Sequence, residues 1–136
     1  MDEFDLVELL KAVQKLEKRV SVALMYSGLR ISQFRFLDRL ERTGQATVSE
    51  MSLALGITRA TASVMTNELI AAHIVATVEN EHDRRSFHIM LTDNGRHKLT
   101  VARSDVGVLQ QKLAAELSNE VRMALGAFTH RSLHVD

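Results

Sequence analysis

The chain has 136 residues, of which 46% are hydrophobic, and its 17 basic and 17 acidic residues give a formal net charge of zero. This length is typical of one compact domain, and the apolar fraction is sufficient for a buried core and for a subunit interface. The sequence contains no cysteine, which excludes disulfides, zinc thiolates and a thiol oxidation switch. We therefore expect a single domain, residues 1–136, whose chemistry does not involve thiols.

The sequence carries no signal for insertion into a membrane or for secretion. No run approaches the ~20 consecutive apolar residues that a bilayer span requires. The amino terminus from Met1 to Asp5 is acidic, whereas a secretory signal begins with basic residues. We expect a cytoplasmic protein with no membrane partner.

A long amphipathic helix is predicted from Phe4 to about Ser27. Its apolar residues recur at intervals of three and four, which is the period of one helical face: Leu6, Leu9, Leu10, Val13, Leu16, Val20 and Leu24. Gly28 interrupts this pattern. We expect Ser32 to cap a second helix that ends before Thr43-Gly44.

Two short helices joined by a tight turn are predicted next. Thr47 and Glu50 form a capping box, in which each side chain bonds the backbone N–H of the other residue, so a helix begins near Val48. Gly56 ends that helix because glycine adopts the left-handed conformation without steric cost. Thr58 caps the following helix, which runs from Arg59 to about Ala72. In that helix we expect Val64, Met65 and Leu69 to face the core, and Arg59, Thr61, Ala62, Ser63 and Thr66 to face outward.

A β-hairpin follows, with strands at 74–78 and 86–91. Both runs are rich in β-branched and large apolar residues, and in the second run Phe87, Ile89 and Leu91 alternate with Ser86, His88 and Met90. We expect Phe87 to be a core residue. The charged segment 79–85 forms the tip.

Two carboxy-terminal helices complete the pattern. Thr92 caps a long helix whose apolar positions are spaced three and four residues apart, close to a heptad seam: Leu99, Ala102, Val106, Leu109, Leu113 and Leu117. Ser118 begins a last short helix that extends through about Phe128. The order of elements predicts a mostly α fold with a small β-hairpin wing (α+β), namely a winged helix-turn-helix flanked by long terminal helices.

The helix that begins after Thr58 has the features of a recognition helix. A helix in the major groove offers its first two turns to base edges, where small polar side chains and an arginine are useful. Arg59, Thr61, Ser63 and Thr66 meet this demand. The start of a helix also attracts a phosphate oxygen, which gives Thr58 and Arg59 a second possible role. The alternative is that Thr58 only caps the helix and Arg59 is solvated.

The hairpin tip offers a second contact with DNA. An arginine on a projecting tip can enter a narrow minor groove, where the negative potential is strongest, and Arg84 is our candidate. Arg85 is a further DNA-binding candidate. Asp83 can pair with Arg85 and shape the loop, since an exposed pair contributes only ~0 to 1 kcal/mol to stability.

Three arginines upstream could add phosphate contacts. Arg35, Arg39 and Arg42 recur on one helical face, where they form either an auxiliary flank for the phosphate backbone or an ordinary solvated surface. Residues 46–98 themselves carry slightly more acidic than basic side chains, so the predicted DNA-binding part is locally neutral.

The sequence resembles the MarR (multiple antibiotic resistance regulator) family. The resemblance is carried by Asp83-Arg84-Arg85-Ser86 followed by 91–96 (Leu-Thr-Asp-Asn-Gly-Arg), and by Ser32-Gln33-Phe34-Arg35-Phe36-Leu37 and Thr58-Arg59-Ala60-Thr61. It covers residues 28–100 by motif and the remainder by helix order. It implies a homodimer formed through dimerisation helices at about 1–27 and 99–136, with the winged helix-turn-helix at about 30–98.

The resemblance also implies a function. Such a dimer binds pseudo-palindromic double-stranded DNA, usually as a repressor, and takes a small ligand, often an anionic aromatic, between its dimerisation helices and its DNA-binding part. The chain departs from the family pattern at His73, where glycine is usual, at Val64 or Glu68, where a cation is usual, and at Thr77, where arginine is usual. We therefore expect weaker DNA binding than is typical, or a larger role for the three upstream arginines. The alternative is a winged-helix protein-interaction module that no longer binds DNA.

No catalytic or metal-binding pattern competes with this interpretation. The six histidines could ligate a metal only if three or more ligands converged in space, and their spacing does not require that. The sequence has no glycine-rich phosphate loop, nucleophile elbow or zinc-protease helix. We expect no metal, no cofactor and no enzymatic activity.

Overall fold

The computed structural model of the chain describes residues 4–83 and 85–134. In this part the elements are α1 (Leu6–Leu24), the 3₁₀ helix η1 (Met25–Ser27), α2 (Ile31–Thr43), α3 (Val48–Leu55), α4 (Arg59–Ala71), β1 (Val75–Glu79), β2 (Phe87–Leu91), α5 (Asp93–Glu116) and α6 (Asn119–His134). The predicted mostly α fold with a β-hairpin wing is confirmed.

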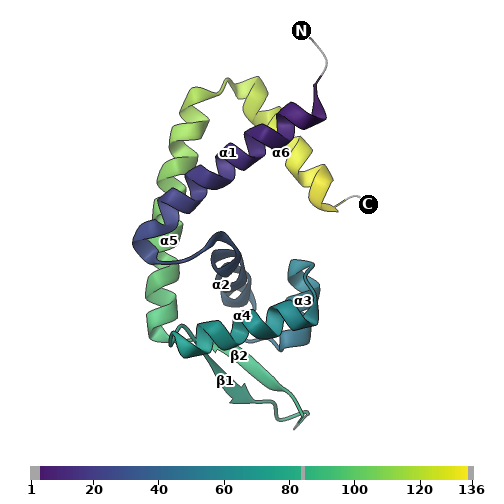
Figure 1. Ribbon diagram of the computed structural model, residues 1–136, viewed down its shortest axis with the longest axis vertical. Helices are drawn as coiled ribbons and strands as arrows, with labels where there is room; N and C mark the ends of the chain where they lie inside the picture. Colours follow the sequence, from purple (N-terminus) through teal and green to yellow (C-terminus); the bar gives the residue numbers. More distant parts are fainter. Residues whose placement is uncertain (1–3, 84, 135–136) are drawn as a thin grey trace.

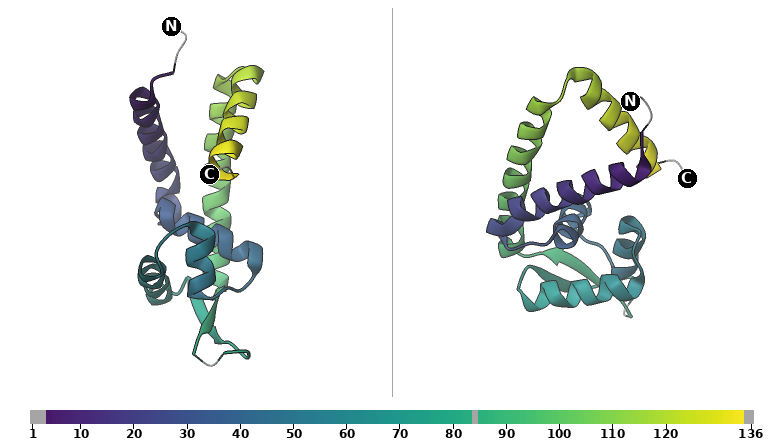
Figure 2. Two further views of the ribbon diagram at one scale, coloured as in Figure 1. Left: turned by 90° about the vertical axis from the view of Figure 1, so that its right-hand side faces the viewer. Right: turned by 45° about the horizontal axis from the view of Figure 1, so that its top comes forward.

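The helices and the hairpin form a head with two arms. Helices α2, α3 and α4 and the hairpin make up the head, and the hairpin projects from it as a wing (Figure 1). Helix α5 runs from the wing to the opposite end of the molecule, where it turns into α6. Helix α1 packs against α5 and forms the second arm, so the two arms stand side by side above the head (Figure 2).

A single cluster of buried side chains holds the head to the base of both arms. The largest fully buried members come from seven different elements: Leu24, Phe36, Leu37, Leu40, Met51, Leu69, Val75, Ile89 and Leu99. The strands pair antiparallel with Val75 opposite Leu91. Ala46 forms an isolated antiparallel β-bridge with Ile89 of β2, in which the two residues exchange backbone hydrogen bonds of 3.1 and 2.7 Å. The wing is therefore anchored in the core at its base.

Four of the five helix starts predicted at a serine or threonine are confirmed. The side-chain oxygens of Thr47, Thr58, Thr92 and Ser118 each accept a hydrogen bond from the backbone N–H three residues later, at 3.0 to 3.2 Å. The prediction for Ser32 is wrong, since α2 begins at Ile31. The backbone N–H of Arg30 donates to the Gln33 side chain at 3.0 Å, and this bond defines the start of α2 without a hydroxyl cap.

Two further expectations are wrong. Helix α6 continues to His134 instead of ending near Phe128, because no glycine or proline follows Phe128 to interrupt the backbone hydrogen bonds within the described chain. Phe87 is 54% exposed although Ile89 and Leu91 on the same face of β2 are buried. The outer end of the hairpin extends beyond the core, so the strand alternation there no longer corresponds to burial.

The start of α5 is pressed against the turn that follows α4. In this turn His73 has a φ of 59°, a left-handed conformation that non-glycine residues rarely adopt. The Thr92 hydroxyl lies 2.7 Å from the carbonyl oxygen of His73 and 3.0 Å from that of Ile74. A Cβ atom at Gly95 would lie 2.1 Å from the Ile74 carbonyl oxygen. Only glycine fits at Gly95, and the contact fixes α5 to the end of α4 and the beginning of β1.

We expect Gly95→Ala to lower the free energy of unfolding by about 3 kcal/mol, because the added methyl group must displace backbone atoms of a packed turn. Gly107, in the same helix, has no atom within 4 Å of its Cβ position, so Gly107→Ala should raise stability by up to ~1 kcal/mol through helix propensity. Urea unfolding followed by circular dichroism measures both. Equal effects of the two substitutions would contradict the role assigned to the contact at Gly95.

Candidate nucleic-acid interface

Helices α3 and α4 form the predicted helix-turn-helix. Gly56 ends α3 in the left-handed conformation, with a φ of 65°, and the chain turns directly to the α4 cap. Glu50 bonds the backbone N–H of Thr47, and this bond, with the Thr47 hydroxyl, lowers the pKa of the Glu50 carboxyl. The carboxylate thus stays charged beside the positive end of α3 and stabilises its start.

The start of α4 places Thr58, Arg59 and Thr61 at the surface. The Thr58 oxygen accepts from the Thr61 backbone N–H at 3.1 Å, and the Thr58 hydroxyl donates to the Thr61 side-chain oxygen at 2.9 Å. Thr58 is therefore occupied as a cap. Arg59 projects from the first turn and is exposed.

The orientation of α4 differs from the sequence prediction at three residues. Ala62 and Thr66 were expected to face outward but are buried, and Thr66 is only 4% exposed. The Thr66 hydroxyl donates to the Ala62 carbonyl oxygen at 2.7 Å, so this side chain is not available to bases. Val64 was expected in the core but is 58% exposed. The buried side of α4 packs closely against α3, and small residues suit that close contact better than valine.

The outward side of α4 is a stripe of five exposed residues, which we call the outer stripe: Ala60, Ser63, Val64, Asn67 and Ala71. Of these five residues, only Ser63 is proposed from the sequence as a DNA contact, and Asn67 is not considered. Its position was available from the sequence, since Asn67 lies three and four residues after Val64 and Ser63, which places all three on one helical face.

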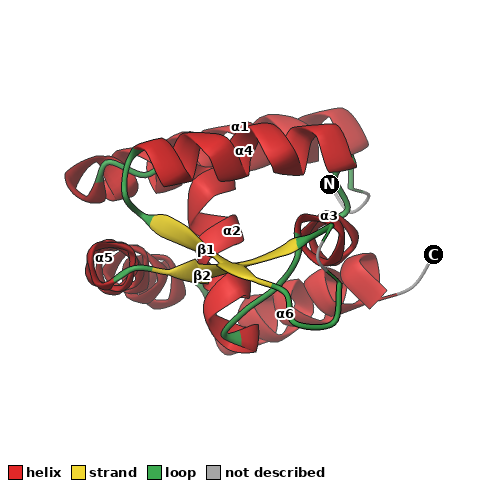
Figure 3. Cartoon of the chain, turned by 90° about the horizontal axis from the view of Figure 1, so that it is seen from below, coloured by secondary structure: helices red, strands yellow, loops and turns green. Residues whose placement is uncertain are grey.

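A hollow with a volume of about 570 Å³ lies between α4, the start of α3 and the wing. Figure 3 views the molecule from the wing side and shows the hairpin crossing this end of the molecule. The residues that line the hollow include Arg59, Ser63, Thr66 and Asn67 from α4, Thr47 and Ser49 from the start of α3, and Asp83 and Arg85 from the wing. The fold thus brings Arg59 and Arg85 to the same hollow.

The wing tip is a folded turn. Asp83 accepts a hydrogen bond from the Arg85 backbone N–H at 2.9 Å and lies 3.8 Å from its guanidinium Nε. Asn80 is buried, and its amide bridges the tip by donating to Ser86 at 3.0 Å and accepting from the His82 N–H at 3.0 Å. Asp83 therefore has the local geometry expected of a wing-shaping residue, and sequence reasoning missed Asn80. Arg84, the minor-groove candidate, lies outside the described residues.

The three upstream arginines are exposed on α2. Arg42 pairs with Asp38 at 3.4 Å, which reduces the positive charge that this flank presents. All three are among the described residues, and none of Arg35, Arg39 and Arg42 lines the hollow that holds Arg59 and Arg85. The structure does not bring the two groups of cations into one site.

Three ion pairs connect α2 and the residue before it to neighbouring helices. Arg30 contacts Glu68 of α4 at 2.7 Å, so the acidic residue that departs from the family pattern has a cationic partner. Arg103 of α5 binds Glu41 and also Asp38, the latter at 2.6 Å, and the hydrogen bonds that its guanidinium donates to these two carboxylates raise the pKa of Arg103. The ion pairs of Arg103 thus attach the head to α5, in addition to the contact at Gly95.

Over residues 4–83 and 85–134, no group of three or more histidine, aspartate or glutamate side chains is arranged to hold a metal ion. In the same part of the chain, no helix is long and apolar enough to cross a membrane.

Solved structures with the same fold are those of winged helix-turn-helix proteins. A mutant MarR from E. coli in complex with operator DNA superposes with a TM-score of 0.83 at 22% identity, over 94% of this chain and 93% of that one. MepR from S. aureus, in a DNA complex, gives 0.82 at 21% identity, over 96% and 97%. MosR from M. tuberculosis, in complex with DNA, gives 0.73 at 23% identity, over 96% of each chain.

The sequence comparison agrees with the fold. Residues 27–86, which include α2, α3, α4, β1 and most of the wing tip, match the model described as MarR family. No curated protein sequence matches the chain. The chain is a winged helix-turn-helix protein. Residues 27–86 are therefore similar to the MarR family, in line with the resemblance carried by the motifs at the wing and at the start of α4.

Proposed function

We propose that the chain is a dimeric, sequence-specific DNA-binding transcriptional regulator of the cytoplasm and not an enzyme. The observation that carries this proposal is the exposed outer stripe of α4, flanked by a hollow that contains both Arg59 and Arg85. A helix with small exposed side chains can enter the major groove, which is about 12 Å wide, and approach base edges closely. The DNA complexes of MarR, MepR and MosR support the same interpretation.

In this proposal Arg59 and Arg85 bind phosphates beside α4, on the side of the helix that faces the wing. Arg59 lies in the first helical turn, where the partial positive charge of the helix also favours an anion. Arg85 lies on the wing and follows Asp83, which orders the tip. Thr61 and Ser63 are within the first two turns of α4 and can donate to phosphate or base oxygens. Arg84 remains our proposal for the minor groove.

We expect Arg59→Ala to weaken DNA binding about tenfold at low salt and to reduce the slope of log affinity against log salt by ~0.9, the value for one phosphate contact. The site would be obtained by selection from a random duplex library, and fluorescence anisotropy would measure the affinity. Arg131→Ala is the matched control, because this exposed arginine lies on α6, which is part of neither the helix-turn-helix nor the wing. Identical salt slopes for the wild type and Arg59→Ala would contradict the contact.

The dimer proposal depends on apolar surface at the ends of both arms. Helices α1 and α6 expose large hydrophobic side chains that have no function in a monomer: Leu6, Val7, Leu10, Val13, Leu16, Val121, Met123, Leu125, Phe128 and Leu133. Contiguous apolar surface of this kind marks an interface between proteins. Two copies joined through these helices would present two α4 helices related by two-fold symmetry, which matches a pseudo-palindromic operator.

We expect the wild type to sediment at twice the 15.2 kDa mass of the chain. Leu10→Lys should shift the equilibrium to monomer and abolish protection of the second half-site, because a charge would be buried between subunits. Leu10→Met, which nearly conserves volume, should remain dimeric. Sedimentation equilibrium and footprinting test this, with half-sites about 10 base pairs apart. A wild-type monomer at micromolar concentration would overturn the proposal.

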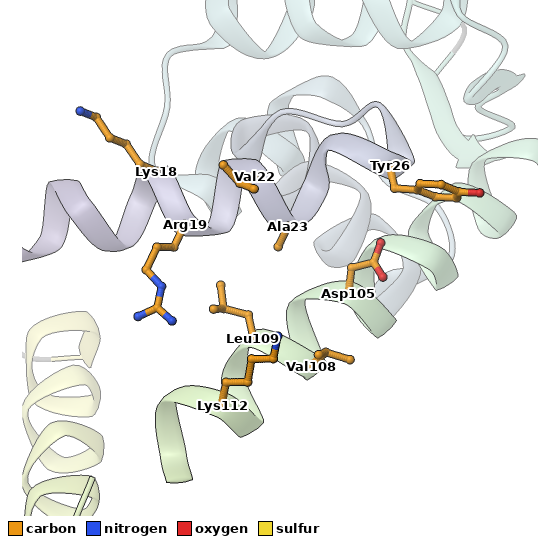
Figure 4. A pocket seen from close by; sticks show the side chains of 9 residues that line it. All are labelled: Lys18, Arg19, Val22, Ala23, Tyr26, Asp105, Val108, Leu109 and Lys112. Carbon is orange, nitrogen blue, oxygen red and sulfur yellow. The ribbon is translucent and has the colours of Figure 1, made fainter. Parts of the chain in front are cut away.

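A cavity of about 780 Å³ between α1 and α5 is the candidate effector site. Figure 4 shows Arg19 and Ala23 pointing from α1 toward α5, and Leu109 pointing from α5 toward α1. The lining is mainly apolar, with Lys18, Arg19 and Lys112 as cations and Asp105 as the acid. This chemistry suits a small aromatic anion. We propose that such a ligand moves α5 and thereby releases a repressor from DNA.

Benzoate is a suitable probe of this site, with benzamide as its neutral analogue. We expect millimolar benzoate to weaken DNA binding of the wild type, and benzamide to have a smaller effect, because the charged ligand pairs with cations of the lining. Arg19→Gln should reduce the response to benzoate without changing DNA affinity in its absence. Equal responses to the two probes, or none to either, would contradict an anion-responsive site here.

A second candidate function is supported by exposed apolar residues on the head. Leu53 is 84% exposed on α3, and Val64 and Phe87 are also exposed, as expected for a protein-interaction module that has lost DNA binding. The library selection separates the two functions. If no duplex is enriched even at low salt, the interaction module becomes the better account.

A further inference from the structure

The outer stripe of α4 carries no charge, although both of its edges do. Arg59 lies on the edge that faces the wing and lines the hollow there. Glu68 lies on the opposite edge, where Arg30 neutralises it at 2.7 Å. The surface that α4 would turn toward base edges is therefore made of short polar and apolar side chains.

Within the stripe, two side chains project further than the others. Successive residues of a helix are rotated by about 100° and rise about 1.5 Å, so Ala60, Val64, Asn67 and Ala71 follow one line along α4. The alanines at both ends allow close approach of the helix. Val64 and Asn67, about 4.5 Å apart along the axis, then reach furthest into a groove. Val64 is 58% exposed, so its methyl groups are available for contact.

The chemistry of these two side chains matches an A·T pair and not a G·C pair. The asparagine amide has one donor and one acceptor group in the arrangement that adenine N6 and N7 require. The methyl groups of valine can contact the C5-methyl group of thymine. Guanine is most often read by arginine or lysine, and the described outer stripe contains neither. Ser63 can bond to any base and does not discriminate.

On the basis of the proposed function, we propose that Val64 and Asn67 are specificity-determining residues that read neighbouring A·T pairs in each half-site. Asn67 donates to N7 and accepts from N6 of an adenine, or donates from its amide to N7 alone, while Val64 packs on a thymine methyl group. The A·T preference then comes from the middle of α4, whereas Arg59 and Arg85 bind the backbone without regard to sequence.

Atom-level changes in the DNA test each contact separately. The site selected by the wild-type chain from a random duplex library is resynthesised with deoxyuridine for each thymine in turn, and with 7-deazaadenine for each adenine. Loss of one contacted methyl should lower wild-type affinity about fourfold, and loss of the contacted N7 about tenfold. The affinity of Val64→Ala should be unaffected by deoxyuridine but should still fall with 7-deazaadenine. The affinity of Asn67→Ala should be unaffected by 7-deazaadenine but should still fall with deoxyuridine.

The outcomes separate this inference from the function on which it rests. If a duplex is enriched but both variants remain as sensitive as the wild type to the modified bases, the proposed DNA-binding function is retained and the assignment of Val64 and Asn67 is overturned. The same holds if the selected half-site contains no A·T pair. If no duplex is enriched, DNA binding itself fails and the inference falls with it. Ser104→Ala, an exposed change on α5, should retain both sensitivities.

Discussion

The contact between Gly95 and the carbonyl of Ile74 determines how the two halves of this protein are joined. At this point the turn between α4 and β1 meets the first turn of α5, and the carbonyl oxygens of His73 and Ile74 lie within hydrogen-bond distance of the Thr92 hydroxyl. A side chain at Gly95 would separate them. Because the turn also holds His73 in a left-handed conformation, the structure accepts local backbone strain to keep the recognition-helix candidate close to the long helix.

A second connection makes the junction resistant to rotation. Arg103, about two turns further along α5, binds Asp38 and Glu41 on α2. Helix α5 is thus attached to the head at its start and again higher up, on two sides of the core. If a ligand in the cavity between α1 and α5 displaces α5, as we propose, the head moves with it. The same rigidity would set the separation of the two α4 helices in a dimer.

The sequence predicted the features that depend on neighbours in the chain. The caps at Thr47, Thr58 and Thr92 were found because a helix start is defined within four residues. The orientation of α4 was not found, since it depends on how closely α3 packs against it, and the apolar character of Val64 gave a misleading indication. Asn67 was missed because Val64, which lies on the same helical face, was assigned to the core. Asp83 was predicted to pair with Arg85 two residues away, and its contacts within the tip are equally local, whereas the pairing of Glu68 with Arg30, 38 residues away, has no signal in the sequence.

The central claim, that the outer stripe of α4 lies against bases, is most directly tested by disulfide crosslinking. The chain has no cysteine, so a single introduced thiol reacts without background. The DNA would be the selected duplex carrying a thiol tether on one base of each half-site, projecting into the major groove. Our account predicts that Ser63→Cys crosslinks in high yield under mild reducing conditions and that Ser104→Cys on α5 does not. Equal yields for both positions, or none for Ser63→Cys on a duplex that the protein binds, would contradict it.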